Sequence, residues 1–461
     1  MSYDISIIGA GPGGYVGAIR AAQLGASVAL IEKDFLGGTC LNKGCIPTKA
    51  MLSSVHSLEV VKHAKGHGIN ISDYEIDIHA IYDRQKKIVK QMQKGLEQLL
   101  KSYVNITVYK GEASIVSASK IAVSGETCLE IDTKNIIIAT GSSCASLGNI
   151  DTDHTLVINS DDALNLNMVP ESIVIIGGGA IGIEWSRIFS ALGSDVTIVE
   201  MLDRIAPACD EDISKLLLRL FKKDKVKVKT GVGVKYIEKM PDSVKVVLNN
   251  DEVMEANKVL LAVGRKPNSL FKGIDTIGIE YNSRYIKVNG YMQTNINNIY
   301  AIGDVVGNLP LAHVASHEAI LAVEHIMGRD VEPVDYSLVP FVIYGHPELA
   351  SVGITEEKAK SDNIKYEVNT FHYAANGKAI AESETIGFVK TIIDANTKKI
   401  IGVHIAGANA SDMIHQGVIA VKQGLAKTDF KEMIFAHPTL SESFYESILQ
   451  LHVPGKQKSL R

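Results

Sequence analysis

The sequence predicts an α/β protein in which two similar strand–helix–strand units precede an α+β domain. Residues 7–32 and 175–200 align without a gap, each with an apolar strand, a glycine-rich turn, an amphipathic helix, a second strand and a final glutamate. Their helices stop at Gly25 and Gly193, since glycine commonly follows a helix. From about Tyr336, strands and helices follow without another such glycine pattern, which favours a separate α+β domain.

The composition is that of a globular protein with about three domains. The chain has 461 residues, of which 46% are hydrophobic and 21% charged. A net charge of -5 gives no reason to expect nucleic acid or a membrane surface as a partner. No apolar run reaches the ~18 residues of a membrane span. The N-terminus leads almost directly into a strand, so we expect no targeting peptide and a cytoplasmic location.

Each repeated unit has the residues that a dinucleotide requires, which predicts two Rossmann-like domains. The first glycine permits a tight turn, the second lets the backbone approach a pyrophosphate, and the third lets helix and strand pack closely. The helix N-terminus suits the pyrophosphate, and the final glutamate can accept hydrogen bonds from ribose hydroxyls. A nucleotide-free α/β unit is the alternative, but all features recur at one spacing. The residues are Gly9, Gly11, Gly14 and Glu32 in the first unit, and Gly177, Gly179, Gly182 and Glu200 in the second.

Other segments fit this plan. Thr140 and Gly141 end a buried apolar strand at a glycine turn, and residues 259–268 repeat that style. The alternating, turn-rich pattern over 107–131 indicates a small antiparallel insertion. Residues 69–103 contain a long amphipathic helix without expected catalytic residues.

Cys40 and Cys45 are candidates for a redox-active pair. A regular helix would separate them by ~7.5 Å along its axis, whereas a disulfide needs Cα atoms within ~4.4–6.8 Å. Gly44 and Pro47 allow the distortion that closes this gap, and a helix N-terminus stabilises a thiolate. Two reduced, buried cysteines are the alternative, and the adjacent dinucleotide unit favours redox chemistry. The isolated cysteines Cys128, Cys144 and Cys209 are interpreted as structural.

His437 and Glu442 are candidates for proton transfer. A histidine can shuttle protons near neutral pH, and a nearby glutamate can fix its tautomer. The alternative is that Glu442 only stabilises the first turn of a helix and that His437 is one of many bystanders.

The motifs GGTCLNKGCIPTKA, TNINNIYAIGDV and AHPTLSE resemble the pyridine nucleotide–disulfide oxidoreductase family, over nearly the whole chain. Within it, the likeness is to members that oxidise dihydrolipoyl groups. The resemblance implies FAD and NAD as cofactors, NAD⁺ as the final acceptor and a homodimer. It also implies lipoyl domains and the core acyltransferase of 2-oxoacid dehydrogenase complexes, or the glycine cleavage system, as partners. No metal is expected.

The resemblance also implies roles for individual residues. Cys40 would exchange with the substrate and Cys45 would lie beside the flavin. His437 would be the base, oriented by Glu442, would reach the partner subunit's disulfide, and would precede Pro438 through a cis bond. FAD would be held by Gly9, Gly11, Gly14, Glu32, Lys49 paired with Glu184, Thr140, Gly141, Asp304 and Ala312 at a helix start, and NAD by Gly177, Gly179, Gly182, Glu200 and Gly264.

The same resemblance divides the chain into an FAD domain (1–148), an NAD domain (149–269), a central segment completing the FAD site (270–335) and a dimerisation domain (336–461). Thr48, Pro310 and Val314 depart from the residues usual in the family, which affects the local cofactor contacts.

Three rival functions have discriminating features. A glutathione-type reductase usually carries a basic residue where Glu200 stands. A mercuric reductase usually ends in a vicinal cysteine pair, and this sequence does not. A non-catalytic flavoprotein subunit would lack one of the cysteines or the histidine, and all are present.

Overall fold

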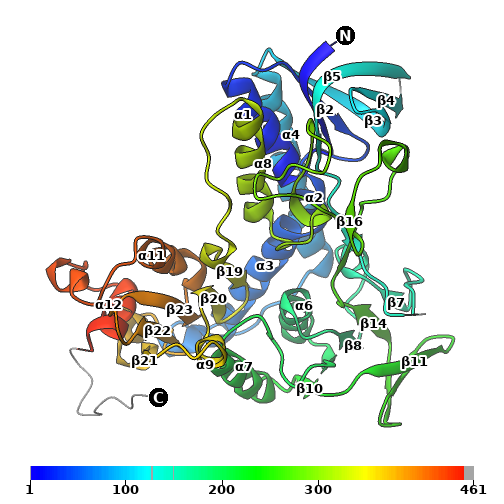
Figure 1. Ribbon diagram of the computed structural model, residues 1–461. Helices are drawn as coiled ribbons and strands as arrows, with labels where there is room; N and C mark the ends of the chain where they lie inside the picture. Colours follow the sequence, from blue (N-terminus) through cyan, green and yellow to red (C-terminus); the bar gives the residue numbers. More distant parts are fainter. Residues whose placement is uncertain (1, 126–127, 149, 451–461) are drawn as a thin grey trace. The chain divides into compact units, whose positions relative to one another are not determined.

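The computed structural model describes residues 2–125, 128–148 and 150–450, and the chain forms two compact units (Figure 1). The first contains Met1–Met51, Asp77–Ala145 and Gly264–Val334. The second contains Leu52–Ile76, Ser146–Val263 and Asp335–Arg461, and its last residues, 451–461, lie outside the described part. The four-domain division expected from the sequence stays a prediction.

The first unit is built on one six-stranded sheet, formed by β1 (Ser2–Ile8), β2 (Val28–Glu32), β3 (Ile106–Ser117), β4 (Lys120–Gly125), β5 (Leu129–Ile138) and β18 (Ile299–Ala301). β1 lies between β2 and β5, and these strands pair in parallel, as do β3 with β2 and β18 with β5. Both faces are covered, so the central strands are continuous apolar runs. β4 pairs antiparallel with β3 and β5, which confirms the predicted insertion.

Helices cover one face of this sheet: α1 (Pro12–Gln23), α4 (Ile78–Lys101) and α8 (Ala312–Ile326). Small residues let α1 and α8 approach closely, since Gly17 of α1 lies against Ala319 of α8. Leu100 of α4 belongs to the same hydrophobic core. Two further pairs of short strands are β6 (Ser142–Cys144) with β15 (Arg265–Pro267), and β16 (Tyr281–Asn282) with β17 (Tyr285–Ile286).

The second unit contains a five-stranded parallel sheet in the order β10 (Lys227–Lys229), β9 (Asp195–Val199), β8 (Ser172–Ile176), β14 (Lys258–Leu261) and β7 (Val157–Ile158). Its helices are α5 (Ser160–Ala163), α6 (Ala180–Ala191) and α7 (Glu211–Lys223). An antiparallel sheet of β11 (Val234–Lys239), β12 (Val244–Leu248) and β13 (Val253–Ala256) shares a core with the parallel sheet.

The two repeated units have the same register. Ile5 of β1 pairs with Val28 of β2, and the equivalent residues Ile173 and Val196 pair in β8 and β9. α1 and α6 also begin and end at equivalent positions of the repeat. The predicted pair of strand–helix–strand units is therefore confirmed.

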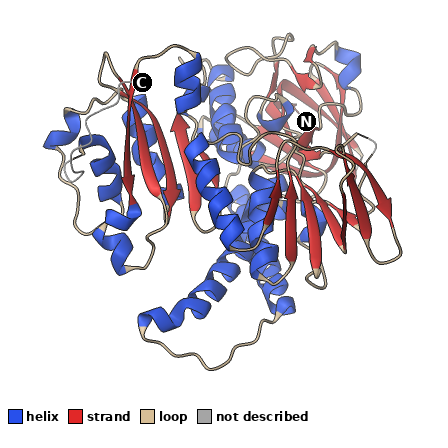
Figure 2. Ribbon diagram, turned by 90° about the horizontal axis from the view of Figure 1, so that it is seen from below, coloured by secondary structure: helices blue, strands red, loops and turns tan. Residues whose placement is uncertain are grey.

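The C-terminal part of the second unit is an antiparallel sheet in the order β19 (Phe341–Ile343), β20 (Glu348–Gly353), β23 (Ile400–Gly407), β22 (Phe388–Asp394) and β21 (Tyr366–His372). Two helices, α11 (Ala410–Lys422) and α12 (Ser441–Leu449), pack on this antiparallel sheet. Figure 2 shows helices in blue beside the red strands of this C-terminal part. The shorter helices are α9 (Glu356–Ser361) and α10 (Gly377–Ala381). This part has the α+β architecture expected from the sequence.

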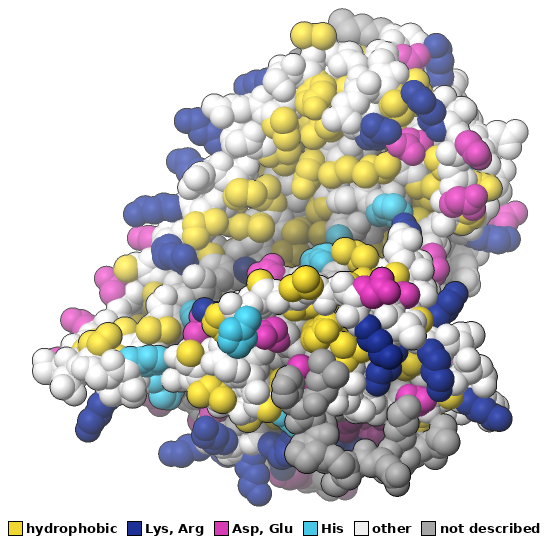
Figure 3. Space-filling view, turned by 90° about the vertical axis from the view of Figure 1, so that its left-hand side faces the viewer, with side chains coloured by type: hydrophobic (Ala, Val, Ile, Leu, Met, Phe, Trp, Pro, Cys, Tyr) yellow, Lys and Arg dark blue, Asp and Glu magenta, His cyan; other side chains and the backbone are white. Residues whose placement is uncertain are grey.

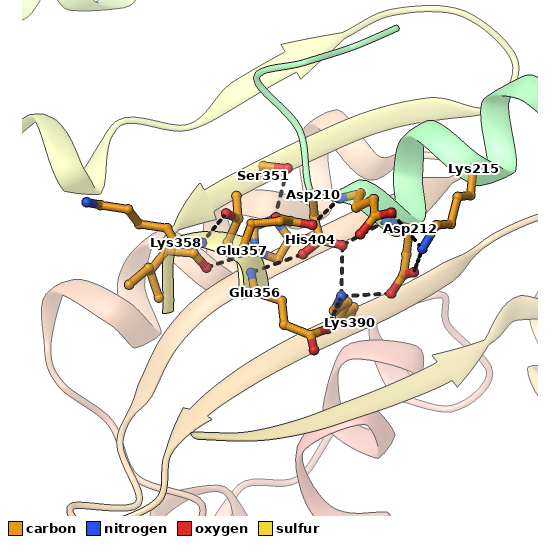
Figure 4. A network of polar contacts seen from close by, with 12 residues as sticks. Asp210, Asp212, Lys215, Ser351, Glu356, Glu357, Lys358, Lys390 and His404 are labelled. Carbon is orange, nitrogen blue, oxygen red and sulfur yellow. Dashed lines mark hydrogen bonds and ion pairs between the residues drawn. The ribbon is translucent and has the colours of Figure 1, made fainter. Parts of the chain in front are cut away.

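A buried lysine ties this sheet to α7 (Figure 4). Lys390 of β22 is only 1% exposed, and its Nζ lies 2.8 Å from Asp210, 2.7 Å from Asp212 and 2.8 Å from Glu356. Burial opposes the charge on Lys390, but these carboxylates outweigh it and raise its pKa. Nearby His404 is fully buried, which lowers its pKa and keeps the ring neutral.

On the face shown in Figure 3, basic and acidic side chains are interspersed.

Across residues 2–450 with their two short gaps, no helix has both the length and the apolar character needed to cross a membrane.

Candidate active site

The first glycine turn fits close to its own sheet. Gly9 has φ +102°, and a Cβ there would lie 2.4 Å from the Ala139 carbonyl oxygen. A Cβ on Gly14 would lie 1.8 Å from the carbonyl oxygen of Gly9, so only glycine allows this helix to pack on this turn. By contrast, the nearest atom to a Cβ on Gly11 is 3.9 Å away, in Gly38. Gly11 therefore leaves room beside the helix N-terminus.

The second turn repeats this geometry. Gly177 has φ +113°, and its Cβ would lie 2.3 Å from the Ala262 carbonyl oxygen. A Cβ on Gly182 would lie 1.9 Å from the oxygen of Gly177, whereas a Cβ on Gly179 would meet no described atom within 4 Å. No side-chain cap occupies the N-terminus of α1 or α6, and the first N–H groups of α6 and those that follow Pro12 in α1 have no acceptor within their helix. Both positions fit a pyrophosphate.

In each glycine turn, a backbone N–H donates a hydrogen bond to the glutamate at the end of the second strand. Glu32 Oε2 accepts a hydrogen bond of 2.7 Å from the Ala10 N–H, and Glu200 Oε2 accepts one of 2.6 Å from the Gly178 N–H. The other oxygen, Oε1, accepts a backbone hydrogen bond of 2.8 Å in both cases, from Asp34 and from Leu202. These bonds fix each carboxylate at its strand end. Each oxygen retains a second lone pair, so ribose hydroxyls can still bind.

The segments around Thr140 and Gly264 interlock. Thr140 Oγ1 donates to the Asn268 carbonyl at 2.8 Å, and the Asn268 amide donates back to the Thr140 carbonyl at 3.0 Å. The Asn268 N–H also donates to the Gly141 carbonyl at 2.9 Å, and Gly264 accepts from Ala145 at 3.1 Å. The two glycine turns that resemble each other in sequence are therefore joined within the first unit.

Asp304 belongs to a polar cluster at the end of β18. Its carboxylate accepts a hydrogen bond from the Ser142 hydroxyl and lies 3.7 Å from Arg265 Nε. Arg265 also donates 2.6 Å to Ser142 Oγ and 2.7 Å to its carbonyl oxygen. α8 begins at Ala312, and its buried Glu318 accepts the Gly303 N–H at 2.6 Å. The loop that carries Asp304 is therefore held by Ser142 through the Asp304 carboxylate and by Glu318 through the Gly303 N–H.

The cysteine pair lies at a break between two helices. Cys40 is in α2 (Gly38–Lys43) and Cys45 is the first residue of α3 (Cys45–His63), with Gly44 between them. A Cβ on Gly44 would lie 3.1 Å from the Thr39 carbonyl oxygen, so the glycine permits this close turn. The two cysteines are free thiols whose side chains are in hydrogen-bond contact. The predicted local distortion is therefore confirmed.

The charge distribution of the pair is asymmetric. A hydrogen bond with Cys45, together with burial, raises the pKa of Cys40 far above its usual value, and Lys49 offsets this only in part. Cys45 stands at the N-terminus of α3, where the helix dipole favours an anion. Both effects favour the proton on Cys40 and the negative charge on Cys45. Burial also raises the pKa of Tyr15.

His437 and Glu442 form a pair in the C-terminal sheet domain. His437 Nδ1 lies 2.9 Å from Glu442 Oε1, while Glu442 Oε2 accepts the Thr439 N–H at 2.9 Å. Burial raises the pKa of Glu442, but the Thr439 and His437 contacts outweigh it, so the net shift is downward. The His437 side chain is 78% exposed and its Nε2 points away from this carboxylate contact. The expected cis His437–Pro438 bond is present.

Several expected residues fall in different units. Cys40, Cys45, Lys49, Asp304, Ala312 and Gly264 belong to the first unit, and Glu184, Glu200, His437 and Glu442 to the second. The pairing of Lys49 with Glu184 and the position of Gly264 beside the second turn stay predictions. Glu184 itself is buried on α6 and accepts the Tyr344 N–H at 3.1 Å.

Sequence reasoning missed four residues around these sites: Tyr15, Ser142, Arg265 and Glu318. Ser142 and Arg265 directly follow the two glycine turns that were singled out, so their position was the available signal. Glu318 lies on the buried face of α8, and a glutamate in an otherwise apolar helical stripe is an unusual residue that asks for a partner. Nothing in the sequence distinguishes Tyr15 from a core aromatic residue.

Residues 3–319 match the pyridine nucleotide-disulphide oxidoreductase family, and residues 339–448 match its dimerisation domain. The chain belongs to this family. Family membership implies FAD and NAD(H) as cofactors, and the two open glycine turns fit two dinucleotides.

Two relatives and one solved structure show how far the likeness extends. A Bacillus subtilis protein named dihydrolipoyl dehydrogenase is 41% identical over 96% of this chain and 95% of its own. A Chlamydia muridarum protein of the same name is 39% identical over 99% of both chains. The crystal structure of LpdA from Mycobacterium tuberculosis covers 98% of this chain and 100% of its own with a TM-score of 0.91, at 24% identity, and so supports the fold.

Proposed function

We propose that the protein oxidises dihydrolipoyl groups to lipoyl groups and passes the electrons through FAD to NAD⁺. The observation that carries this proposal is the contact between Cys40 and Cys45 across Gly44, in a chain about two-fifths identical to full-length proteins named dihydrolipoyl dehydrogenase. Lipoyl domains and the core acyltransferase of 2-oxoacid dehydrogenase complexes, or the glycine cleavage system, are the proposed sources of substrate. The match to the dimerisation domain supports a homodimer. The cytoplasmic location stays a prediction.

In this mechanism the oxidised enzyme holds Cys40 and Cys45 as a disulfide. His437 removes a proton from one substrate thiol, and the resulting thiolate attacks Cys40 Sγ. The bond between Cys40 and Cys45 breaks, and Cys45 leaves as a thiolate. Cys45 is the better leaving group because the α3 N-terminus stabilises its charge.

The second substrate thiol then closes the lipoyl disulfide by attacking the sulfur bound to Cys40. Cys40 departs and takes the first proton from His437, which agrees with its raised pKa. His437, now free again, takes the proton of the second substrate thiol, so both substrate protons stay on the protein. The substrate has lost two electrons and the protein disulfide has gained them. FAD, when bound, supplies the route by which this pair of electrons reaches NAD⁺.

Residue roles around the cofactors follow from the two turns. Gly9, Gly11, Gly14 and Glu32 are proposed to hold the FAD adenosine and pyrophosphate. The remaining parts of FAD are proposed to be held by Thr140, Gly141, Asp304 and the α8 N-terminus at Ala312. The reactive edge of the flavin is proposed to lie near Lys49 and Glu184. NAD is assigned to Gly177, Gly179, Gly182, Glu200 and Gly264. His437, oriented by Glu442, acts on the disulfide of the other subunit.

The test is NADH formation by the purified holoenzyme with dihydrolipoamide and NAD⁺, compared with reduced glutathione as the donor. We expect turnover with dihydrolipoamide only, loss of turnover in Cys45→Ser, and unchanged turnover in Cys128→Ser, which removes an exposed cysteine outside the site. Equal turnover with glutathione would overturn the substrate assignment.

A further inference from the structure

Two histidines and a glutamate lie close together in the second unit, and the proposed thiol exchange uses none of them. His56 and Glu59 lie on α3, three residues apart and therefore on one face of the helix. His346 lies in the loop between β19 and β20. One donor atom from each side chain lies within 4.8 Å of the other two. The sequence analysis expected no metal, and His346 is almost 300 residues distant from the two ligands on α3.

One oxygen of Glu59 is fixed and the other is available. Oε1 accepts a hydrogen bond of 2.7 Å from Arg187 Nη2. Oε2 is buried and has no hydrogen-bond partner among the described residues. A buried carboxylate oxygen without a partner is costly, and a cation beside it would remove that cost.

α6 holds both sides of the cluster in place. Its Arg187 fixes Glu59, and its Glu184 accepts the Tyr344 N–H at 3.1 Å, two residues before His346. A second carboxylate, Glu384, lies 3.4 Å from His346 Nε2. Such a carboxylate next to a histidine ligand orients the ring and increases its basicity, or supplies a fourth ligand itself.

We propose that His56, Glu59 and His346 form a binding site for one borderline divalent metal ion, for which Zn²⁺ is the best match. Two imidazoles and one carboxylate are a common zinc ligand set, and Co²⁺ can replace Zn²⁺ in such a set as a weaker-binding spectroscopic substitute. Bonds of ~2.0–2.1 Å require donors about 3.3 Å apart in a tetrahedral site. The side chains would therefore close by at most about 1.5 Å, and exposed His56 can make most of that movement.

The bound ion would tie α3 to the β19–β20 loop within the second unit. The binding energy would come on top of the contacts with α6, so it would stabilise this unit without taking part in thiol exchange. This inference does not depend on the proposed substrate. The competing interpretation is an ordinary polar cluster that binds no ion.

The experiment is a Zn²⁺ titration of the metal-free holoenzyme by calorimetry, with Cys40 and Cys45 kept oxidised so that their thiols do not compete. We expect one ion per chain in the wild type, and at least tenfold weaker binding in His56→Ala and His346→Ala. His67→Ala removes another exposed histidine just beyond α3 and is expected to bind like the wild type. Co²⁺ binding should give the visible absorption of a tetrahedral ion.

No uptake by the wild-type protein would overturn the proposal. Equal uptake by the wild type and both ligand variants would also overturn it, because the metal would then lie elsewhere. Because bound metal is measured directly, this result does not depend on whether dihydrolipoamide is the substrate. Circular dichroism of each variant separates loss of a ligand from loss of the fold.

Discussion

Glu200 Oε2 accepts a 2.6 Å hydrogen bond from the Gly178 N–H, just as Glu32 does at 2.7 Å from Ala10 in the first repeated unit. The Glu200 side chain is thus fixed at the strand end, and the residue is only 9% exposed. Arg204, the one basic residue nearby in sequence, lies 3.6 Å from Glu357 and donates to the Pro207 carbonyl at 3.2 Å. It is therefore engaged elsewhere.

This geometry predicts a preference for NAD over NADP, because Glu200 would repel a 2′-phosphate in a poorly screened site. A charge-assisted hydrogen bond to a ribose hydroxyl contributes ~1.5–3 kcal/mol, so the ratio of kcat/KM values should be about tenfold to a hundredfold or more. Glu200→Gln should narrow that ratio, and exposed Glu238→Gln should not. Equal kcat/KM for the two cofactors in the wild type would contradict the assignment.

The asymmetry of the cysteine pair predicts different behaviour for its two serine variants. Cys40→Ser leaves Cys45 as a free thiolate at the α3 N-terminus, and we expect a long-wavelength absorbance from its contact with oxidised FAD without added substrate. Cys45→Ser should lack this absorbance in every state. Identical spectra for the two variants would rule out separate roles, and Cys128→Ser serves as the control.

The proposed sharing of the site predicts complementation between subunits. Mixed subunits carrying Cys45→Ser or His437→Gln should regain partial activity, since some heterodimers combine one intact disulfide with one intact base. Mixing Cys40→Ser with Cys45→Ser should restore nothing, because neither subunit can form the disulfide. Absence of rescue in the first mixture, with heterodimers demonstrated by mass spectrometry, would place the whole site in one chain.

The contact between His437 and Glu442 predicts a pH dependence. The pKa of Glu442 is lowered, so its stabilising contact is fully present above the usual carboxylate pKa of ~4.3 and is lost as the pH falls through the lower folded value. Glu442 is therefore charged at neutral pH. Loss of a general base costs ~10²–10⁴ in rate, so His437→Gln should reduce kcat by this factor and Glu442→Gln by less. A Glu442→Gln pH–rate profile identical to the wild type would contradict the orienting role.

Lys390 predicts a large stability effect. Lys390→Met would leave Asp210, Asp212 and Glu356 without their shared cation, and breaking a buried ion pair costs ~3–5 kcal/mol. Lys215→Met removes an exposed i,i+4 ion pair with Glu211, which solvent screens, and should lower the free energy of unfolding far less. The midpoint of thermal unfolding should fall much further in Lys390→Met than in Lys215→Met. Similar unfolding midpoints in the two variants would contradict a structural role for the buried network.

The repeat units could be predicted from sequence because their signals are local. Gly14 and Gly182 are required by the carbonyl oxygens of Gly9 and Gly177 in the same turn, and the spacing to Glu32 and Glu200 reproduces one strand–helix–strand geometry. The helix break at Gly44 was predictable for the same reason, since it concerns a few consecutive residues.

Contacts between distant segments could not be predicted in this way. Lys390 meets Asp210 across 180 residues, and Arg265 meets Ser142 across 123. The partners are ordinary charged and hydroxyl residues, so only the folded chain reveals which of them are buried together. The proximity of His346 to Glu59 could not be predicted from the sequence for the same reason.

The central claim is that dihydrolipoyl oxidation proceeds through the Cys40–Cys45 disulfide. The most direct measurement is alkylation of the denatured oxidised holoenzyme, before and after anaerobic addition of one equivalent of dihydrolipoamide without NAD⁺. Of the five cysteines, Cys128, Cys144 and Cys209 should be labelled before addition, and Cys40 and Cys45 should join them afterwards, as located by peptide mass spectrometry. Labelling of all five before addition, or no gain at Cys40 and Cys45 afterwards, would contradict the account.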